Sequence, residues 1–273
     1  MMLRRSFDLT NLIDECALML DSVFANDMDR EAFAARFADF AAADQYLPQV
    51  TDLGSKILSY ESESFLPPEP SLNKSNLFFV VGNPAPESVR RGCMYAYEGA
   101  GARQHRFWKV LHSTGILSFS ELDPDAYSPD EKMQRLFAGD YASPFNVHII
   151  PFFSLPSPPG GKWGGVVGLR RLFGRGFAQI VSAEHEVVRQ LIEMLARDGD
   201  CVLVLQKDAY LAMKPATAPD YDVLTLRTTP LVSHYGRAGV KLMCIPPTRL
   251  LYSRVTRTTL VSLARKGAMS AGE

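Results

Sequence analysis

The sequence has few cysteines and no long hydrophobic run. Its 273 residues include four cysteines, which are widely scattered, and no pair of them has the spacing of a metal knuckle. We therefore expect buried free thiols, as in cytoplasmic proteins. No apolar run approaches the roughly 18 residues that a membrane span needs. The opening stretch, MMLRRSFDLTNL, lacks the apolar segment of a secretory signal. These absences predict a cytoplasmic protein with no membrane partner.

Acidic residues are missing from most of the last fifth of the chain. Residues 223–272 contain no Asp or Glu but eight Lys or Arg, whereas residues 1–70 carry 13 acidic and 5 basic side chains. The net charge of −1 hides this asymmetry. A basic half on a nearly neutral chain predicts a local face that binds a polyanion. The alternative is a solvated surface that happens to be basic.

Apolar spacing in residues 8–64 predicts a helical N-terminal part. The stretch NLIDECALMLDSVF places apolar residues at helical spacing, and DREAFAARFADFAAA repeats Phe33, Phe37 and Phe40 on one face after Asp29, an expected N-cap. The prolines of FLPPEPSLNKSN predict a linker. We therefore expect an N-terminal helical extension and linker over residues 1–70, docked against an α/β domain over residues 71–273.

The rest of the chain alternates apolar runs with helical patterns. Near-continuous apolar runs predict strands at Leu77–Gly82, Val147–Phe153, Cys201–Leu205 and Val240–Ile245, with DVLTL (222–226) as an edge or hairpin partner. HRFWKVLHSTG predicts a helix ending at Gly115, and SAEHEVVRQLIEMLARDG predicts one capped by Ser182. This alternation predicts an α/β fold, a three-layer α/β/α sandwich around a mostly parallel sheet. Ligands of such sheets bind beyond the carboxyl ends of the strands, where Asn83 and Pro84 follow the first strand.

Several motifs occur together and in a recognisable order. They are the strand ending in Asn83-Pro84, HRFWKVLHSTGIL, CVLVLQKDAY and LMCIPPTRLLYSRVTRTTLVSLAR. In this arrangement the chain resembles the uracil-DNA glycosylase superfamily, and most closely its mismatch-specific and thymine-DNA glycosylase branch. The resemblance covers roughly residues 75–266 and rests most specifically on the Arg-Phe-Trp helix.

The resemblance implies a DNA glycosylase that flips a nucleotide out of the helix and hydrolyses its N-glycosidic bond. Asn83 would position the attacking water, because an amide can orient water but is too weakly basic to take its proton. Glu87 is the rival candidate, as a general base. Tyr95 matches the aromatic on which the flipped base stacks, and Tyr97 could exchange roles with it. His148 falls near the position that reads the base edge, with Asn146 as the alternative in register.

Two segments depart from the family pattern. The second motif usually opens with His or Asn before Pro-Ser, whereas this chain has PPTRLLYSR. The group that stabilises the leaving base is therefore open. The stretch from Ser154 to Gly176 looks inserted, is rich in Gly and Pro, and contains four basic residues and no acidic residue. The cysteines do not match an iron–sulfur cluster, so no metal or cofactor is implied.

Basic and aromatic side chains in these two segments are candidates for DNA contact. The candidates are Lys162, Arg170, Arg171, Arg175, Arg249, Tyr252 and Arg254. Tyr252 could fill the gap left by a flipped nucleotide, and Arg254 flanks an expected helix N-terminus. DNA is thus the expected partner of a monomeric protein.

The altered segments bear on the substrate. We hypothesise a modified pyrimidine, such as a substituted cytosine of a phage genome, which would indicate a role in phage defence. A repair enzyme for uracil or mismatched thymine is the alternative within the family, and a non-catalytic DNA-binding relative is another. A nucleotide- or sugar-phosphate-processing enzyme is a third, although the PPGGKWGG glycines lack the spacing of a P-loop.

Overall fold

The computed structural model describes residues 2–8, 11–98, 103–120, 123–236 and 239–270. A five-stranded sheet lies at its centre, in the order β10-β11-β9-β5-β8. Its strands are β5 (Asn76–Val81), β8 (Asn146–Pro151), β9 (Cys201–Val204), β10 (Leu231–His234) and β11 (Lys241–Cys244). Only β10, at one edge, is antiparallel to its neighbour. The central sheet is therefore mixed but mostly parallel, as the sequence predicts.

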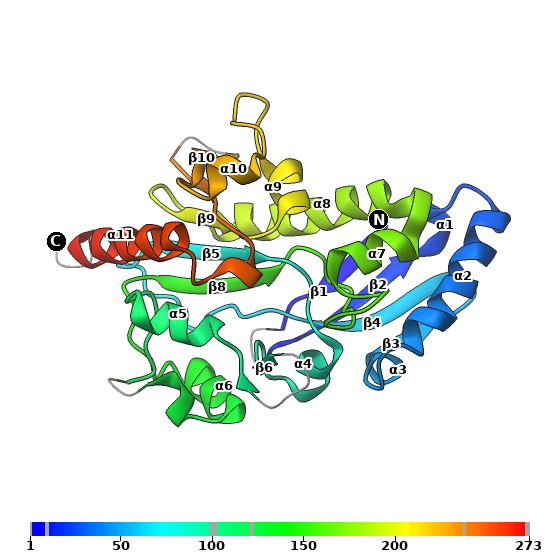
Figure 1. Cartoon of the computed structure of the whole chain (residues 1–273), viewed down its shortest axis with the longest axis horizontal. Coiled ribbons are helices and arrows are strands. Elements are labelled where there is room, and N and C mark those ends of the chain that lie inside the picture. Colours follow the sequence, from blue (N-terminus) through cyan, green and yellow to red (C-terminus); the bar gives the residue numbers. More distant parts are fainter. Residues whose placement is uncertain (1, 9–10, 99–102, 121–122, 237–238, 271–273) are drawn as a thin grey trace.

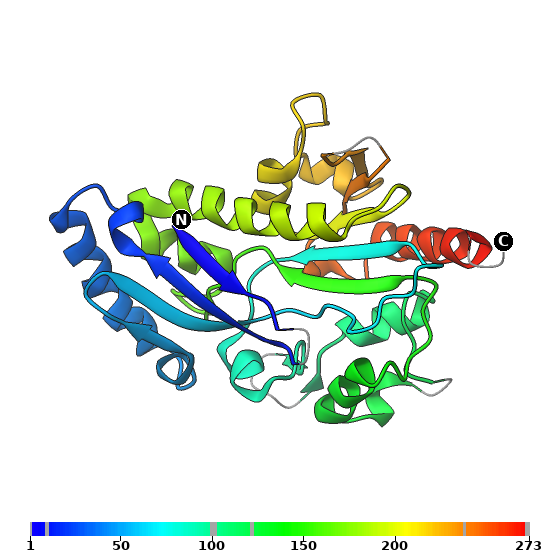
Figure 2. The same cartoon turned by 180° about the vertical axis from the view of Figure 1, so that it is seen from behind.

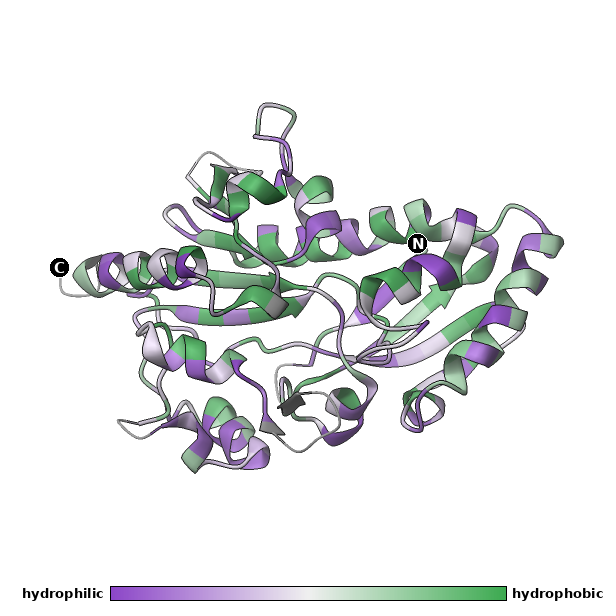
Figure 3. Cartoon of the chain, viewed as in Figure 1, coloured by the Kyte–Doolittle hydropathy of each residue, from purple (hydrophilic) through white to green (hydrophobic). Residues whose placement is uncertain are grey.

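Helices cover both faces of this sheet (Figures 1 and 2). On one face Phe78 and Val80 of β5 pack with apolar residues of α8 (Phe177–Leu195). On the other face Leu77 and Phe79 pack with α5 (Phe107–Ser113) and α11 (Arg254–Ser270). Because successive residues of a strand point to opposite faces, a strand buried on both sides is apolar throughout. Along α11 hydrophobic and hydrophilic residues alternate, as expected of a helix with one solvent face (Figure 3).

Shorter elements surround this sheet. Those along the remainder of the chain are α4 (Pro86–Arg91), β6 (Tyr97–Glu98), β7 (Arg103–Gln104), α6 (Pro129–Phe137), α7 (Gly165–Phe173), α9 (Lys207–Met213), α10 (Val223–Leu226) and the 3-10 turns η1 (Pro124–Ala126), η2 (Gly174–Gly176) and η3 (Thr248–Leu250). As predicted, α5 ends at a glycine in the left-handed conformation, since Gly115 has φ of 73°.

The N-terminal part is not a helical extension, and this prediction was wrong. It forms a second, antiparallel sheet in the order β1-β2-β4-β3. Its elements are β1 (Leu3–Ser6), β2 (Ile13–Met19), α1 (Leu20–Val23), α2 (Asp27–Ala41), α3 (Leu47–Val50), β3 (Thr51–Leu53) and β4 (Ile57–Glu63). Only α2 follows the predicted helical pattern at length. Phe33, Phe37 and Phe40 are buried on one of its faces, and Asn26 rather than Asp29 is its N-cap.

A buried carboxylate explains why β2 was misread. In the strand, Asp14, Cys16 and Leu18 point inward, so the inward face begins with a charged residue. The Arg5 guanidinium of β1 donates to Asp14 at 2.9 Å, and both side chains are fully buried. An inward-facing Asp breaks the alternation of apolar residues that marks a strand, and its partner lies on another strand. Helical spacing was therefore the more visible pattern.

Two other local predictions were wrong. Helix α8 starts at Phe177, so Ser182 lies inside the helix rather than at its N-cap. DVLTL is not a strand but the short helix α10, whose N-cap Asp222 accepts hydrogen bonds from Leu224 N and Thr225 N. The antiparallel edge strand is β10 instead.

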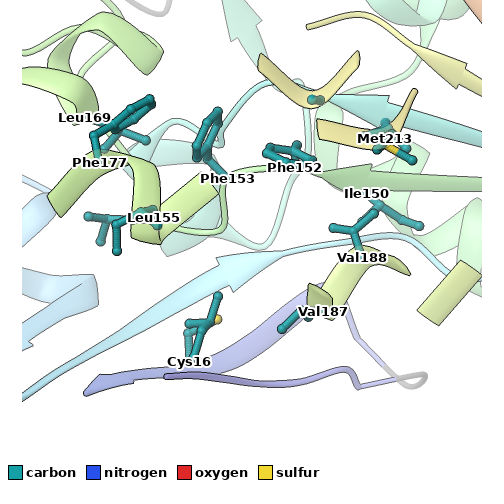
Figure 4. Close-up of a cluster of buried hydrophobic side chains, with 14 of the residues drawn as sticks. Cys16, Ile150, Phe152, Phe153, Leu155, Leu169, Phe177, Val187, Val188 and Met213 are labelled. Atoms are coloured by element: carbon teal, nitrogen blue, oxygen red, sulfur yellow. The ribbon is translucent and has the colours of Figure 1, made fainter. Parts of the chain in front are cut away.

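The two sheets share one hydrophobic cluster. Side chains from β2, β8 and α8 meet there, including Cys16, Ile150, Val187 and Val188 (Figure 4). A backbone bridge between Phe65 and Ile149 joins the end of the N-terminal part to β8. The N-terminal part therefore docks against the central sheet, as expected. Its last residues reach the carboxyl ends of the strands, where Asn83 also lies. All four cysteines are buried and free, as predicted.

Candidate functional site

A pocket of about 1220 Å³ opens at the carboxyl ends of the parallel strands. Residues after β5, β9 and β11 form its back, namely Gly82–Ala85, Leu205–Gln206 and Pro247–Thr248. Its sides come from α4, from the first turn of α7 and from residues 44–46 of the N-terminal part. Of the predicted site residues, Asn83, Glu87 and Tyr95 line this pocket.

Asn83 is held by its amide nitrogen. Its Nδ2 donates to Ser157 Oγ at 2.7 Å and to the carbonyl oxygen of Pro84 at 3.1 Å. The backbone nitrogen of Ser157 also donates to Pro84 O, which ties the segment after β8 to the Asn83 turn. Among the residues that the structure describes, none donates to Asn83 Oδ1. The amide oxygen is thus a fixed hydrogen-bond acceptor in the pocket wall.

Tyr95 is supported from below by α5. Its ring stacks on Phe107 with centroids 4.2 Å apart and contacts His105 at 4.8 Å. The neighbouring Trp108 donates from Nε1 to the carbonyl oxygen of Met94. Tyr95 has φ of 51°, the one positive φ among the described non-glycine residues. Such a conformation costs about 1 kcal/mol or more and is concentrated at functional sites. The Arg-Phe-Trp helix therefore fixes an aromatic ring in the pocket.

Three carboxyl groups line the pocket, those of Asp44, Glu63 and Glu87, and the two glutamates differ in their surroundings. Glu87, in the first turn of α4, is paired with Arg91 at 3.0 Å. Glu63, at the end of β4, is only 4% exposed and accepts a hydrogen bond from Ser88 Oγ at 2.7 Å. Burial raises the pKa of Glu63 to about 8, a change that the hydrogen bond from Ser88 reduces. Glu63 is therefore the carboxyl group of this pocket that burial keeps protonated near neutral pH.

Glycines shape the wall built by the inserted segment. A Cβ on Gly168 would lie 1.9 Å from the carbonyl oxygen of Trp163, and one on Gly164 would lie 2.7 Å from the Gly160 backbone. Only glycine permits these close approaches. They fold the segment back on itself, so that Gly164 and the first turn of α7 face the pocket. The close packing of this turn against α7 explains why the segment is rich in glycine. A phosphate-binding loop is not needed to explain it.

The structure contradicts the base-reading roles predicted for His148 and Asn146. His148 is buried in β8, stacked on Phe78 at 4.5 Å and hydrogen-bonded to Asn76 Oδ1. Asn146 holds the loop at Ser71 through both polar atoms of its side-chain amide: Oδ1 accepts from Ser71 N, and Nδ2 donates to Ser71 O. Because His148 pairs with Phe78, five residues before Asn83, its backbone lies roughly 16 Å from that of Asn83 along the strand. Neither His148 nor Asn146 is among the residues that line the pocket, and both are held by contacts inside the protein.

Most basic side chains of the inserted segment are engaged within the protein. Arg170 pairs with Asp208 at 2.7 Å and lies over the Phe177 ring, and Arg171 donates to the carbonyl oxygen of Lys162. Lys162 lies 3.7 Å from an Asp39 carboxylate oxygen. Arg175 is exposed, and no ion pair with it occurs among the described residues. Only Arg175 of this group is presented without such a partner.

Exposed residues also lie at the start of α11. Tyr252 is 45% exposed, and the Arg106 guanidinium lies 5.3 Å from its ring centroid. Arg106 lines the pocket, so Tyr252 lies beside a residue of the pocket wall. Arg254 is exposed at the first position of α11. The side chains of Tyr97 and Arg249 lie outside the described part of the structure.

Sequence reasoning missed Glu63, Ser88, Ser157 and Arg106, which line the pocket or hold residues that do. Glu63 lies outside the family resemblance, and Ser157 belongs to the stretch within it that looks inserted. No sequence signal marked Glu63: in β4, Leu58, Tyr60 and Ser62 point inward in alternation, which predicts an outward Glu63, and Glu63 is buried against this pattern. Across the described residues, no group of three or more His, Cys, Asp or Glu is placed to hold a metal ion.

Comparisons with known proteins do not assign the chain to a family. No protein-family model matches it, and neither does any curated protein. Among the described helices, none has the length and apolar character needed to cross a membrane.

Proposed function

We propose that this protein is a DNA glycosylase that flips out a modified base and hydrolyses its N-glycosidic bond, leaving an abasic site. The observation that carries the proposal is the pocket at the carboxyl ends of β5, β9 and β11, where Asn83 and Tyr95 line the same cavity. The sequence resemblance to uracil-DNA glycosylases singled out these two residues for water positioning and base stacking.

Asn83 is suited to orient the attacking water. Ser157 and Pro84 O both accept from its Nδ2, so its Oδ1 is held in one direction. A water that donates to Oδ1 is fixed relative to a sugar in the pocket, and orientation of this kind lowers the barrier to attack at C1′. The amide does not take the proton, so the reaction depends on stabilising the departing base.

Tyr95 is suited to hold the flipped base. Its ring is already fixed by Phe107 and His105 before any ligand arrives. Stacking on such a preordered ring contributes roughly 1–3 kcal/mol per base and accepts many bases. The strain at its φ angle is consistent with a ring placed for binding.

The surface around Tyr252 and the start of α11 is suited to DNA. Tyr252 and Arg254 are exposed there, in the segment of the chain that has no acidic residue. An exposed tyrosine can fill the place of the flipped nucleotide, and arginines at a helix start can bind phosphate. Both features match the expected partner.

The walls of the pocket support a bulky base. At about 1220 Å³ the pocket is larger than the roughly 300–1,000 Å³ of typical small-molecule sites. Two of its walls do not follow the family pattern: Pro159–Val167 belongs to the stretch that looks inserted, and Asp44–Tyr46 lies outside the resemblance. Polar groups there could hydrogen-bond a substituent. We therefore propose a substituted cytosine, as found in some phage genomes, as the preferred base, with a role in phage defence.

The test is direct measurement of released bases. Purified protein is offered equal amounts of uracil-containing DNA and hypermodified-cytosine DNA, and free bases are identified by mass spectrometry, with Asn83→Ala as the control. We expect release of the modified base by the parent only. Efficient uracil release with the modified DNA untouched would overturn the substrate assignment and favour a uracil or mismatched-thymine repair enzyme.

One alternative has a specific observation behind it. The second motif, PPTRLLYSR, lacks the His or Asn that stabilises the leaving base in the family. A protein that binds DNA tightly but releases no base from any DNA would be the non-catalytic relative.

A further inference from the structure

The altered second motif raises the question of which group assists the departing base, and Glu63 is placed to answer it. Phe65 pairs with Ile149 in antiparallel fashion, so Glu63 lies opposite Pro151. Pro151 in turn pairs with Val81. The Arg5 guanidinium fixes this row, donating to Pro151 O at 2.9 Å and to Glu63 O at 3.1 Å.

This row of residues brings Glu63 to the carboxyl ends of the strands, where Asn83 also lies. Adjacent strands lie about 4.8 Å apart, so the backbones of Glu63 and Val81 are roughly 10 Å apart across β8. Val81 is two residues before Asn83, and both Glu63 and Asn83 line the pocket. The N-terminal sheet thus delivers a carboxyl group to a site otherwise built by the central sheet.

The hydrogen bonds of Ser88 indicate a protonated Glu63. Ser88 Oγ lies 2.7 Å from Glu63 Oε2 and 3.0 Å from the carbonyl oxygen of Cys93. A hydroxyl has one proton, and a carbonyl only accepts. When Ser88 donates to Cys93 O, the hydrogen between Ser88 and Glu63 must come from Glu63. Both contacts are therefore separate hydrogen bonds only when the Glu63 carboxyl is neutral. When it is ionised, Ser88 donates to Oε2 instead, and this hydrogen bond stabilises the carboxylate.

The surroundings of Glu63 favour the neutral form. The titratable and charged groups that face it are Arg5 from β1, Asp14 from β2, and Cys93 and Tyr95 from the segment after α4. Arg5, the cation among them, is already paired with Asp14. An ionised Glu63 would be a buried charge beside a compensated ion pair, which is costly. Burial accordingly raises its pKa to about 8.

We propose that Glu63 is the leaving-group acid of this pocket, a role that rests on the proposed glycosylase function. As the C1′–N bond breaks, its electron pair departs with the base, and the proton of Glu63 passes to that base. The water held by Asn83 adds its oxygen to C1′, and the water proton returns to the Glu63 carboxylate. The net reaction consumes one water and releases the base with one hydrogen.

Ser88 completes the arrangement as a positioning residue. No described residue is hydrogen-bonded to Glu63 Oε1. When the Ser88 hydroxyl rotates from Cys93 O to donate to Glu63 Oε2, the acidic proton is carried by Oε1 instead. The acid is then free to reach a base in the pocket while Oε2 stays anchored. The carboxyl group replaces the missing His or Asn of the second motif.

The test compares the parent with Glu63→Gln, which keeps a hydrogen-bond donor but removes the acid. Single-turnover release of uracil, of 5-fluorouracil and of a modified cytosine is measured from pH 5 to 10. For the parent we expect the rate to fall as the pH rises through about 8. For Glu63→Gln we expect at least a tenfold loss at neutral pH, no such fall, and a smaller loss with 5-fluorouracil, whose more acidic ring needs less help from an acid.

A second variant and a spectroscopic measurement separate the possible failures. Ser88→Ala removes a hydrogen bond that lowers the pKa of Glu63, so the fall in rate should move to higher pH. Infrared difference spectra of parent against Glu63→Gln should show a protonated carboxyl at pH 7. If the parent is active but Glu63→Gln matches it at every pH, or if the carboxyl is ionised at pH 7, the acid role is wrong. If the parent releases no base from any DNA, the proposed function itself fails.

Discussion

The strands of the central sheet carry similar polar residues at their amino ends (the amino edge) and at their carboxyl ends (the carboxyl edge). The two sets differ in what surrounds them. At the amino edge, Asp200 accepts hydrogen bonds from Asn76 N, from Asn76 Nδ2 and from Arg197 N. Asn76 also bonds to Asn146 and His148. At the carboxyl edge, the Asn83 amide is anchored through its nitrogen only, and the residue lines a pocket.

This difference teaches that residue type alone does not mark a site. An Asn with its polar atoms satisfied inside the protein stabilises the fold, because an unpaired buried polar group costs about 1–3 kcal/mol. His148 is paired through Nε2 only, and its buried Nδ1 has no hydrogen-bond partner among the described residues. An Asn held by one end, in a pocket, keeps an acceptor available for a ligand. Variants at the two ends of the strands should therefore separate loss of activity from loss of stability.

Asn83→Ala should lower the rate of base release by roughly 100-fold or more, the size expected when one positioned group at a reaction centre is removed. DNA affinity should stay within a few fold, because Asn83 is assigned to water. Single-turnover base release and fluorescence anisotropy measure the two effects. Asn146→Ala, at the opposite edge, should keep its activity per folded molecule. Equal activity of Asn83→Ala and the parent would remove Asn83 from the mechanism and promote Glu87.

Asp200→Ala should reverse this pattern and lower the free energy of unfolding by about 3 kcal/mol, because two buried donors and one part-buried donor lose their acceptor. Base release should be unchanged wherever the variant is folded. Asp220→Ala is the matched control: this carboxylate is 95% exposed and paired with Lys214, so its loss should change stability by less than about 0.5 kcal/mol. Denaturant unfolding measures both, and equal losses would show that the amino-edge network does not stabilise the fold.

Tyr95→Ala should weaken binding to DNA that contains the flipped base by roughly 1–3 kcal/mol through the loss of stacking. Tyr95→Gly should bind equally weakly. Its free energy of unfolding should be higher than that of Tyr95→Ala by about 1 kcal/mol, because glycine tolerates φ of 51°. Titration calorimetry and denaturant unfolding give the two quantities. Should Ala and Gly variants be equally stable, the backbone at Tyr95 would not be strained.

His148→Leu should reduce the sensitivity of the fold to acid. Burial, reinforced by Arg197, lowers the pKa of His148 from 6.5 to about 3, so between these values the unfolded chain takes up a proton that the folded chain does not. The contribution of the neutral His148 to the free energy of unfolding is therefore complete above pH 6.5. It decreases as the pH falls below 6.5, by about 1.4 kcal/mol per pH unit for one proton. Unfolding free energies at pH 7 and pH 5 measure it, and an identical pH dependence in both proteins would contradict a buried neutral His148.

Salt dependence of DNA binding should separate the exposed Arg254 from the ion-paired Arg170. Affinity should fall with salt, and Arg254→Ala should reduce the log–log slope by about one. Arg170→Ala should change the slope less, because Arg170 is paired with Asp208. Binding that does not depend on salt, or a larger effect of Arg170, would show that DNA lies on another face.

The local pattern of apolar residues predicted an element correctly where its buried side chains only had to be apolar. The runs at β5, β8, β9 and β11 predicted buried strands because both faces of a covered sheet require apolar residues. The Phe repeat predicted α2 in the same way. The pattern failed at β2, where Asp14 points inward to Arg5, and at His148, whose partner Asn76 lies on another strand.

The sequence by itself determined the strands of the central sheet, the main helices on its faces and the position of Asn83 at a strand's carboxyl end, because these follow from short-range periodicity and chain order. Only the tertiary structure decided which polar residues share a pocket. Glu63 reaches Asn83 through a bridge from Phe65 to Ile149, and His148 is turned into the core by Asn76 and Phe78. Such pairings join residues dozens of positions apart, and whether a polar group is satisfied depends on these distant partners rather than on its neighbours in the chain.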